Sequence, residues 1–193
     1  MTTSPVDPNR ILLTGENSFI RLAESEGGPH LTRVSHWRIL LSPQGPGHVL
    51  FFKSDVVGDE ILIYSDNIAL TRWLQCEIES FLFPEFADQD IPVINAEFSK
   101  VGDGKSFWTE KITSEEDSIS LAWYDFLEPF MLRVEAGSNP TRPHGVYSCF
   151  IPAQQAQITF NGLVAEGKVF LEPRGDKQSS AACLAWSETW VRP

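Results

Sequence analysis

The sequence has few cysteines and no motif in which they are closely spaced. Its three cysteines, Cys76, Cys149 and Cys183, are far apart along 193 residues, so no Cys-x-x-Cys pair is present to form a zinc knuckle or a redox couple. An odd number of isolated cysteines with apolar neighbours is typical of thiols that stay reduced and buried. We therefore expect a cytoplasmic protein without disulfide bonds.

The chain also lacks an excess of positive charge and any long apolar run. It has 15 Lys and Arg against 26 Asp and Glu, which gives a formal net charge of −11. Such a negative field repels phosphate backbones and anionic lipid surfaces. No stretch approaches the ~18 apolar residues of a membrane helix, and the first residues lack the basic start and apolar segment of a secretory signal. We expect neither nucleic acid nor a membrane as a partner.

Several motifs of known chemistry are missing. There is no Gly-x-Ser-x-Gly elbow, no P-loop and no Gly-x-Gly-x-x-Gly turn opening a helix, so we expect no organic cofactor. His30, His36 and His48 would suit zinc if they met, or two of them with a carboxylate would suit ferrous iron. However, no metal-binding spacing such as His-x-His occurs, and His30 and His48 begin their strands. We expect no metal.

Aromatic residues and strand-like alternation are what the sequence does contain. Hydrophobic residues make up 42% of the chain, with 13 Phe, 6 Trp and 3 Tyr, enough for a large core or a lined cavity. Residues 30–41 alternate with period two and place His30, His36 and Arg38 on one face. Turn signals such as Ser42-Pro43-Gln44-Gly45-Pro46-Gly47 separate about ten segments of this kind.

One helix is expected, after a cap at Ser65-Asp66-Asn67. Its apolar residues Leu70, Leu74, Ile78 and Phe81 recur at helical spacing, and Pro84 bounds its far end. This pattern turns Arg72, Gln75 and Glu79 outward.

The number of strands and the scarcity of helices predict an all-β, mainly antiparallel fold. Parallel strands need crossover connections, which a single helix does not supply. A long meander closes into a barrel or folds into a sandwich, because open edges invite aggregation. We expect one barrel domain over residues 1–193, with a loose tail at 1–9 and the helix plugging one end or packing outside. The meander, with tryptophans near strand ends, resembles lipocalin-like (calycin) barrels in architecture, although the lipocalin motif is not at its usual place near the N-terminus.

The last strand carries the most pointed candidate. Strict alternation puts Leu184, Trp186, Glu188 and Trp190 on one face, so that Glu188 stands between two tryptophans. If this face is interior, desolvation raises the pKa of Glu188 and suits it to general acid–base catalysis. The alternatives are a surface ion pair or a buried structural carboxylate.

Four further candidates accompany it. Alternation puts Trp123, Asp125 and Leu127 on one face and Tyr124 on the other, and either Asp125 or Tyr124 would be able to share a pocket with Glu188. Arg38 and Arg133 each interrupt an apolar strand. Inside a barrel they would clamp a carboxylate, and on an outer face they would be solvated.

These residues lead to one functional hypothesis and two alternatives. The first is a cofactor-free β-barrel enzyme, a lyase, isomerase or hydrolase, acting on a small apolar or aromatic molecule. Glu188 would act as acid or base with His36 or Asp125, and Arg38 or Arg133 would orient the substrate. The alternatives are a non-catalytic binding protein with the same cavity and a structural module that forms a homodimer. The substrate would lie between four aromatic residues: Trp123, Tyr124, Trp186 and Trp190.

Overall fold

The computed structural model describes residues 8–58, 60–138 and 143–193. Of the expected tail at 1–9, residues 1–7 lie outside this range, and Pro8–Arg10 form a 3-10 turn that leads directly into the first strand. No helix in the described ranges is long and apolar enough to cross a membrane. The strands are β1 (Ile11–Ala23), β2 (His30–Leu41), β3 (Gly47–Ser54), β4 (Ile61–Ser65), β5 (Val93–Asn95), β6 (Glu97–Gly102), β7 (Phe107–Thr113), β8 (Ser118–Phe126), β9 (Phe130–Val134), β10 (Gly145–Phe160), β11 (Leu163–Val164), β12 (Leu171–Arg174), β13 (Lys177–Ser180) and β14 (Ala182–Val191).

Twelve of these strands form one sheet in the order β5-β4-β3-β2-β1-β14-β10-β8-β7-β6, with β9 and β11 attached to β10. Every pairing in it is antiparallel except that of β4 with β5. The sheet curls into a nearly closed barrel. Closure is incomplete because β5 and β6, the two ends of the sheet, follow each other in the chain but do not pair in a ladder. The predicted all-β, mainly antiparallel barrel is confirmed.

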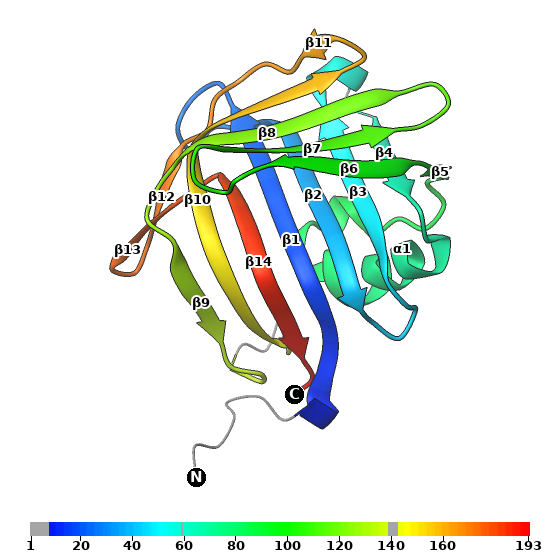
Figure 1. The fold of residues 1–193 in the computed structure, drawn as a ribbon, viewed down its shortest axis with the longest axis vertical. Coiled ribbons are helices and arrows are strands. Elements are labelled where there is room, and N and C mark those ends of the chain that lie inside the picture. The colour runs from blue at the N-terminus through cyan, green and yellow to red at the C-terminus, as the bar shows by residue number, and fades with distance from the viewer. Residues whose placement is uncertain (1–7, 59, 139–142) are drawn as a thin grey trace.

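The long strand β10 belongs to both layers of the barrel. Its first part pairs with β14 and β9, and its second part pairs with β8 and β11. Figure 1 shows the result: β6, β7 and β8 run across one end of the longer strands β1, β2, β3 and β14. Between these layers lies the larger core, which includes Leu22, Val34, Phe52, Leu121 and Trp123.

The helical segment packs on the outside of the barrel, one of the two expected positions. Asn67 caps α1 (Ile68–Leu74), its side chain accepting a hydrogen bond from Leu70 N. The chain continues as a π-helical turn, Gln75–Glu79, and as α2 (Ser80–Leu82). Figure 1 shows the helices against the outer face beside β3. There a second core forms, in which Leu70, Leu74 and Ile78 meet Trp37, Phe51 and Ile63.

The face that this segment turns to the sheet differs from the expectation. Gln75 and Glu79, predicted to point outward, are fully buried. A π turn holds more residues than an α turn, so the buried positions follow a period close to four, and Gln75 and Glu79 rotate inward. Gln75 bonds the carbonyl oxygens of Phe86 and Asp88.

The predicted shared face of the last strand is wrong, and a β-bulge is the reason. Ser187 has a left-handed backbone (φ 52°), and the β10–β14 register shifts between Tyr147 and Cys149. An extra residue at a bulge reverses the alternation. Trp186 therefore belongs to the interior core, whereas Glu188 and Trp190 lie on the outer face under the helices.

A second left-handed residue, Asp125 (φ 56°), ends the alternation of β8 in the same way. Trp123 is fully buried in the barrel, and Phe126 rather than Asp125 packs against the same core. Asp125 is exposed and accepts a hydrogen bond from Gln155. The predicted common face of Trp123 and Asp125 is therefore not observed.

Candidate functional site

A row of charged and polar side chains crosses the sheet at one end of the barrel interior. Glu16 on β1 pairs with Arg38 on β2, and Arg38 pairs with His48 on β3. Directly paired residues of antiparallel strands have neighbouring side chains on one face. Asp66, which follows β4, extends the row by bonding His48. We call Glu16, Arg38, His48 and Asp66 the mouth row.

Arg38 and Glu16 form a two-point ion pair in the mouth row. Arg38 Nε donates to Glu16 Oε2 at 2.8 Å, and Nη2 donates to Oε1. Both side chains are largely shielded from solvent. The hydrogen bond to Glu16 raises the pKa of Arg38, against the effect of burial. A planar guanidinium held in this way is fixed in position and still has Nη1 directed away from the pair.

His48 is held by Asp66 through two contacts. Asp66 Oδ1 accepts from the backbone N of His48 at 2.6 Å, and Oδ2 lies 2.7 Å from its ring Nδ1. The ring stacks on Phe98 of β6, with centroids 5.0 Å apart and planes at 15°. His48 thus links the two layers of the barrel at its mouth.

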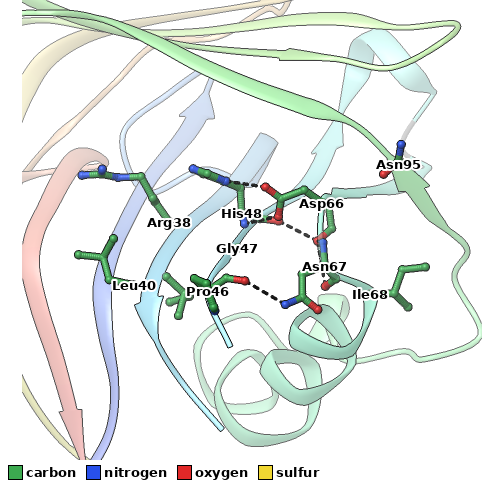
Figure 2. A pocket seen from close by; sticks show the side chains of 11 residues that line it. Arg38, Leu40, Pro46, Gly47, His48, Asp66, Asn67, Ile68 and Asn95 are labelled. Carbon is green, nitrogen blue, oxygen red and sulfur yellow. Dashed lines mark hydrogen bonds and ion pairs between the residues drawn. The ribbon is translucent and has the colours of Figure 1, made fainter. Parts of the chain in front are cut away.

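A groove of about 730 Å³ opens beside the mouth row. Figure 2 shows the His48 ring extending from Asp66 toward the side of the groove on which Arg38 lies. Asn95 and the first residues of α1 form the opposite wall. Its rim is apolar, since Leu40 and Ile68 are both about 60% exposed (62% and 61%). The groove thus combines a cation, an oriented imidazole and apolar walls.

Two ring nitrogens in the barrel interior are buried without a hydrogen-bond partner in the described part of the chain: His36 Nε2 and Trp186 Nε1. Burial lowers the pKa of His36 to about 3, and the positive charges of Arg38 and Lys100 add to this effect. His36 is therefore neutral across the physiological range. Trp186 contacts Trp108 edge-to-face, with centroids 4.9 Å apart.

Glu110 on β7 faces the mouth row from the opposite layer. It is 5% exposed and accepts a hydrogen bond from Trp108 Nε1 at 2.8 Å. Burial raises the pKa of Glu110 to about 7, although the Trp108 bond and the charge of Lys100 oppose this rise. Sequence reasoning missed Glu110. The signal was present in Trp108-x-Glu110, the same tryptophan–glutamate alternation that singled out Glu188.

The turn between β6 and β7 covers Trp186. The side chain of Asp103 accepts backbone hydrogen bonds from Lys105 and Ser106, which fixes the turn. Gly104 lies so close to Trp186 that a Cβ there would be 2.4 Å from the indole ring. The turn therefore closes the interior at this point, and access to the mouth remains on the side of the groove.

Comparison with known proteins gives no match: no protein-family model, no curated protein and no solved structure is significantly similar to this chain. The functional argument therefore rests on the geometry of the site. Among the described residues, no three His, Cys, Asp or Glu side chains gather in a way that would hold a metal ion.

The structure brings some of the sequence-predicted residues together and separates others. His36, Arg38, Trp123 and Trp186 all face the barrel interior. Trp123 uses its indole N–H to bond Phe19 O at 3.1 Å. Of the residues predicted for the site, Arg38, His36 and Trp186 therefore lie on the same interior side of the barrel as the mouth row.

The remaining candidates lie elsewhere. Tyr124 is partly buried near the end of β8, between Phe107 of β7 and Gln155 of β10, and Asp125 is exposed beside it. Arg133 lies on the exposed face of β9, where it bonds Glu135 at 2.5 Å and stacks over Tyr147. Hydrogen bonding to Glu135 raises the pKa of Arg133. Glu188 and Trp190 lie under the helices, on the other face of the sheet from the mouth row.

Glu188 does have the property for which the sequence singled it out. It is 3% exposed, and burial raises its pKa to about 7, against the hydrogen bond from Trp190 Nε1 at 2.6 Å. Glu79, from the π turn, meets the same interface. Burial raises its pKa to about 7 as well, and the charges of Glu85 and Glu188 add to the rise.

Proposed function

We propose that the protein binds a small, partly aromatic molecule with hydrogen-bonding groups at the mouth of its barrel. The observation that carries this proposal is the pair of buried ring nitrogens, His36 Nε2 and Trp186 Nε1, that lack a partner among the described residues. Buried polar atoms in folded proteins are almost always paired. A ligand that accepts a hydrogen bond from the Trp186 indole and packs against its ring would satisfy one of them.

The composition of the mouth supports this choice of ligand. The indoles of Trp108 and Trp186 supply flat apolar surface, and Lys100 lies over the Trp108 ring at 5.2 Å. Sites for small organic molecules are mostly apolar, with a few polar groups that fix orientation. Arg38 and His48 are those polar groups where the interior meets the groove.

Binding is tested with benzoate and phenylpyruvate as probes. Trp186→Phe removes the unpaired N–H and keeps an aromatic ring, so we expect the affinity for a bound probe to fall about five- to tenfold, the effect of one net hydrogen bond. Trp73→Phe, in the helical segment outside the barrel, is the matched control and should leave affinity unchanged. Fluorescence titration and the rise in Tm on ligand addition measure both. Equal responses of the two variants would contradict binding at the mouth.

A second candidate function, acid–base catalysis by a lyase, isomerase or hydrolase at the same mouth, is favoured by Glu110. A carboxyl group with a pKa near 7 is suited to exchange protons at neutral pH. We assign this role to Glu110 rather than to Glu188 because Glu110 faces Arg38 and Glu16. If Glu110 is the catalytic group, Glu110→Gln abolishes turnover and leaves probe binding nearly intact. If the protein only binds its ligand, the wild type shows no turnover and Glu110→Gln leaves binding unchanged.

Two further expectations belong to this proposal. Cys76, Cys149 and Cys183 are all free thiols, which suits a protein of the reducing cytoplasm. A homodimer stays a prediction, and sedimentation or light scattering at several protein concentrations tests it.

A further inference from the structure

The contact between Asp66 and His48 determines which ring nitrogen of the histidine is free. An ionised carboxylate only accepts hydrogen bonds, so Nδ1, 2.7 Å from Asp66 Oδ2, carries the proton and donates it. The lone pair is then on Nε2, which makes no hydrogen bond to the part of the chain that the structure describes. A histidine oriented by a carboxylate in this way is the usual arrangement of a catalytic base.

The ring is also held where a ligand can reach it. Asp66 fixes His48 through both its backbone N and its ring, and Phe98 stacks against one face. The side chain of His48 remains about one-third exposed (31%) and lines the groove. The geometry therefore combines a fixed orientation with access from solvent, two requirements for general-base catalysis.

The other groups of the groove indicate the kind of molecule that would lie against His48. Arg38 pairs directly with His48 across β2 and β3, and its Nη1 makes no hydrogen bond to the described residues. This nitrogen is suited to a carboxylate. The exposed side chains of Leu40 and Ile68 supply apolar surface.

The groove lacks the parts needed for acyl transfer through the enzyme. Ser65, the serine in its lining, uses its hydroxyl to bond the carbonyl oxygens of His48 and Asn67. No cysteine is among the lining residues. An oriented base without a nucleophile is suited to moving protons, not to forming a covalent intermediate.

We propose that His48, oriented by Asp66, is a general base that removes a proton from the carbon next to the carbonyl group of a small 2-oxo carboxylic acid bound in the groove. This inference rests on ligand binding at the mouth and names the substrate class and the base. Arg38 binds the carboxylate.

The step conserves atoms and charge. His48 Nε2 takes the proton, the electron pair of the broken C–H bond forms the C=C bond of an enolate, and the carbonyl π electrons move to oxygen. The imidazolium, stabilised by Asp66, then returns a proton to the enolate oxygen or to carbon. The net reaction is tautomerisation or racemisation, and no other reactant is consumed. Asp66 acts as a positioning residue.

The test follows the exchange of the CH₂ protons of phenylpyruvate for deuterium in D₂O by ¹H NMR, with binding measured by ligand line broadening in the same samples. Free imidazole at the same concentration gives the background rate. We expect the protein to exceed this background at least 100-fold and His48→Asn to lose at least 90% of the excess. His30→Asn, a histidine outside the groove that bonds Arg33, is the matched control and should keep the full rate.

Asp66→Asn separates positioning from mere folding. Loss of the carboxylate leaves the imidazole without its fixed orientation, so the maximal rate of exchange should fall about tenfold or more while the phenylpyruvate concentration at half-maximal rate stays nearly the same. A structural role alone would lower the rate only in proportion to the amount of folded protein.

Each outcome decides between the proposals. Line broadening without exchange above the imidazole background would overturn the role of His48 and leave ligand binding standing. Exchange that is lost in Glu110→Gln but kept in His48→Asn would also overturn it, and would support Glu110 as the base. Absence of both broadening and exchange would overturn the binding of this substrate class together with the inference.

Discussion

Glu79 and Glu188 meet one buried interface from opposite sides, and each accepts a hydrogen bond from a tryptophan of the sheet. Trp37 Nε1 donates to Glu79 at 2.5 Å and Trp190 Nε1 donates to Glu188 at 2.6 Å, and the two indoles lie 6.2 Å apart. Each carboxyl has a pKa of about 7, raised by burial. Docking of the helical segment on the barrel is therefore linked to proton binding.

Glu188→Gln should stabilise the protein at pH 8 and flatten the dependence of its stability on pH. The carboxyl binds a proton more tightly in the folded state (pKa about 7) than in the unfolded chain (4.5). Its contribution is therefore full below pH 4.5 and is lost as pH rises through 7. We expect Glu188→Gln to gain about 2–3 kcal/mol relative to wild type between pH 5 and pH 8. Urea unfolding at both pH values measures this gain.

Glu77→Gln provides the control for this experiment, because Glu77 is exposed on the same helical segment. The free energy of unfolding of Glu77→Gln should change between pH 5 and pH 8 as that of the wild type does. A Glu188→Gln curve parallel to that of the wild type would show that Glu188 is not the group whose protonation matters.

The bulge at Ser187 should respond to backbone preference alone, because its side chain is exposed. Its φ of 52° lies in the left-handed region, which glycine adopts freely and a β-branched residue avoids. We expect Ser187→Val to be less stable than Ser187→Gly by about 1–2 kcal/mol. Thermal unfolding measures the difference, and equal stabilities would contradict a bulge at this position.

Gly104 and Gly58 form a matched pair for testing the closed turn over Trp186. Both have φ of +66°, but a Cβ on Gly58 meets open space and one on Gly104 would meet the Trp186 ring. Gly58→Ala should cost about 1 kcal/mol from backbone strain alone. Gly104→Ala should cost about 2–4 kcal/mol, because the indole must also move. Only Gly104→Ala should alter the near-UV circular dichroism of the tryptophans.

The ion pair between Arg38 and Glu16 should show measurable coupling. A double-mutant cycle with Arg38→Met and Glu16→Gln is expected to give about 1–2 kcal/mol, above the value of an exposed pair, because the contact is two-pointed and shielded. Arg133→Met with Glu135→Gln, an exposed pair at the end of β9, should show much less coupling. Coupling energies of equal size in the two cycles would mean that the mouth offers no special environment.

Local rules explain why the architecture could be read from the sequence. Period-two alternation, as in His30–Leu41, and Gly/Pro-rich turns identify antiparallel strands almost without tertiary information. The Asn67 cap and the spacing of Leu70, Leu74 and Ile78 identify the helical segment in the same way. These features depend on neighbours within a few residues, which the sequence displays directly.

The site depended on features that alternation does not display. A single left-handed residue, Ser187, moved Glu188 and Trp190 to the opposite face from Trp186. The choice of a π turn over an α turn decided the direction of Glu79. The pairing of Glu16 with Arg38, and of Arg38 with His48, depends on the register between successive strands, which turns and β-bulges set and which alternation within one strand does not determine.

Strand β10 is the connection between the two layers of the barrel. In the described ranges, ladder hydrogen bonds join strands β6–β8 to strands β1–β4 and β14 only through β10. Along β10, the partner strand changes from β9 to β8 around Pro152. On the open side, the two groups of strands are joined by Ala96, the single residue between β5 and β6, and by the hydrogen bond from Tyr64 OH to Asp117 Oδ2. A change in the angle between the two groups would therefore bend β10 near Pro152 and alter the separation of Phe98 and His48.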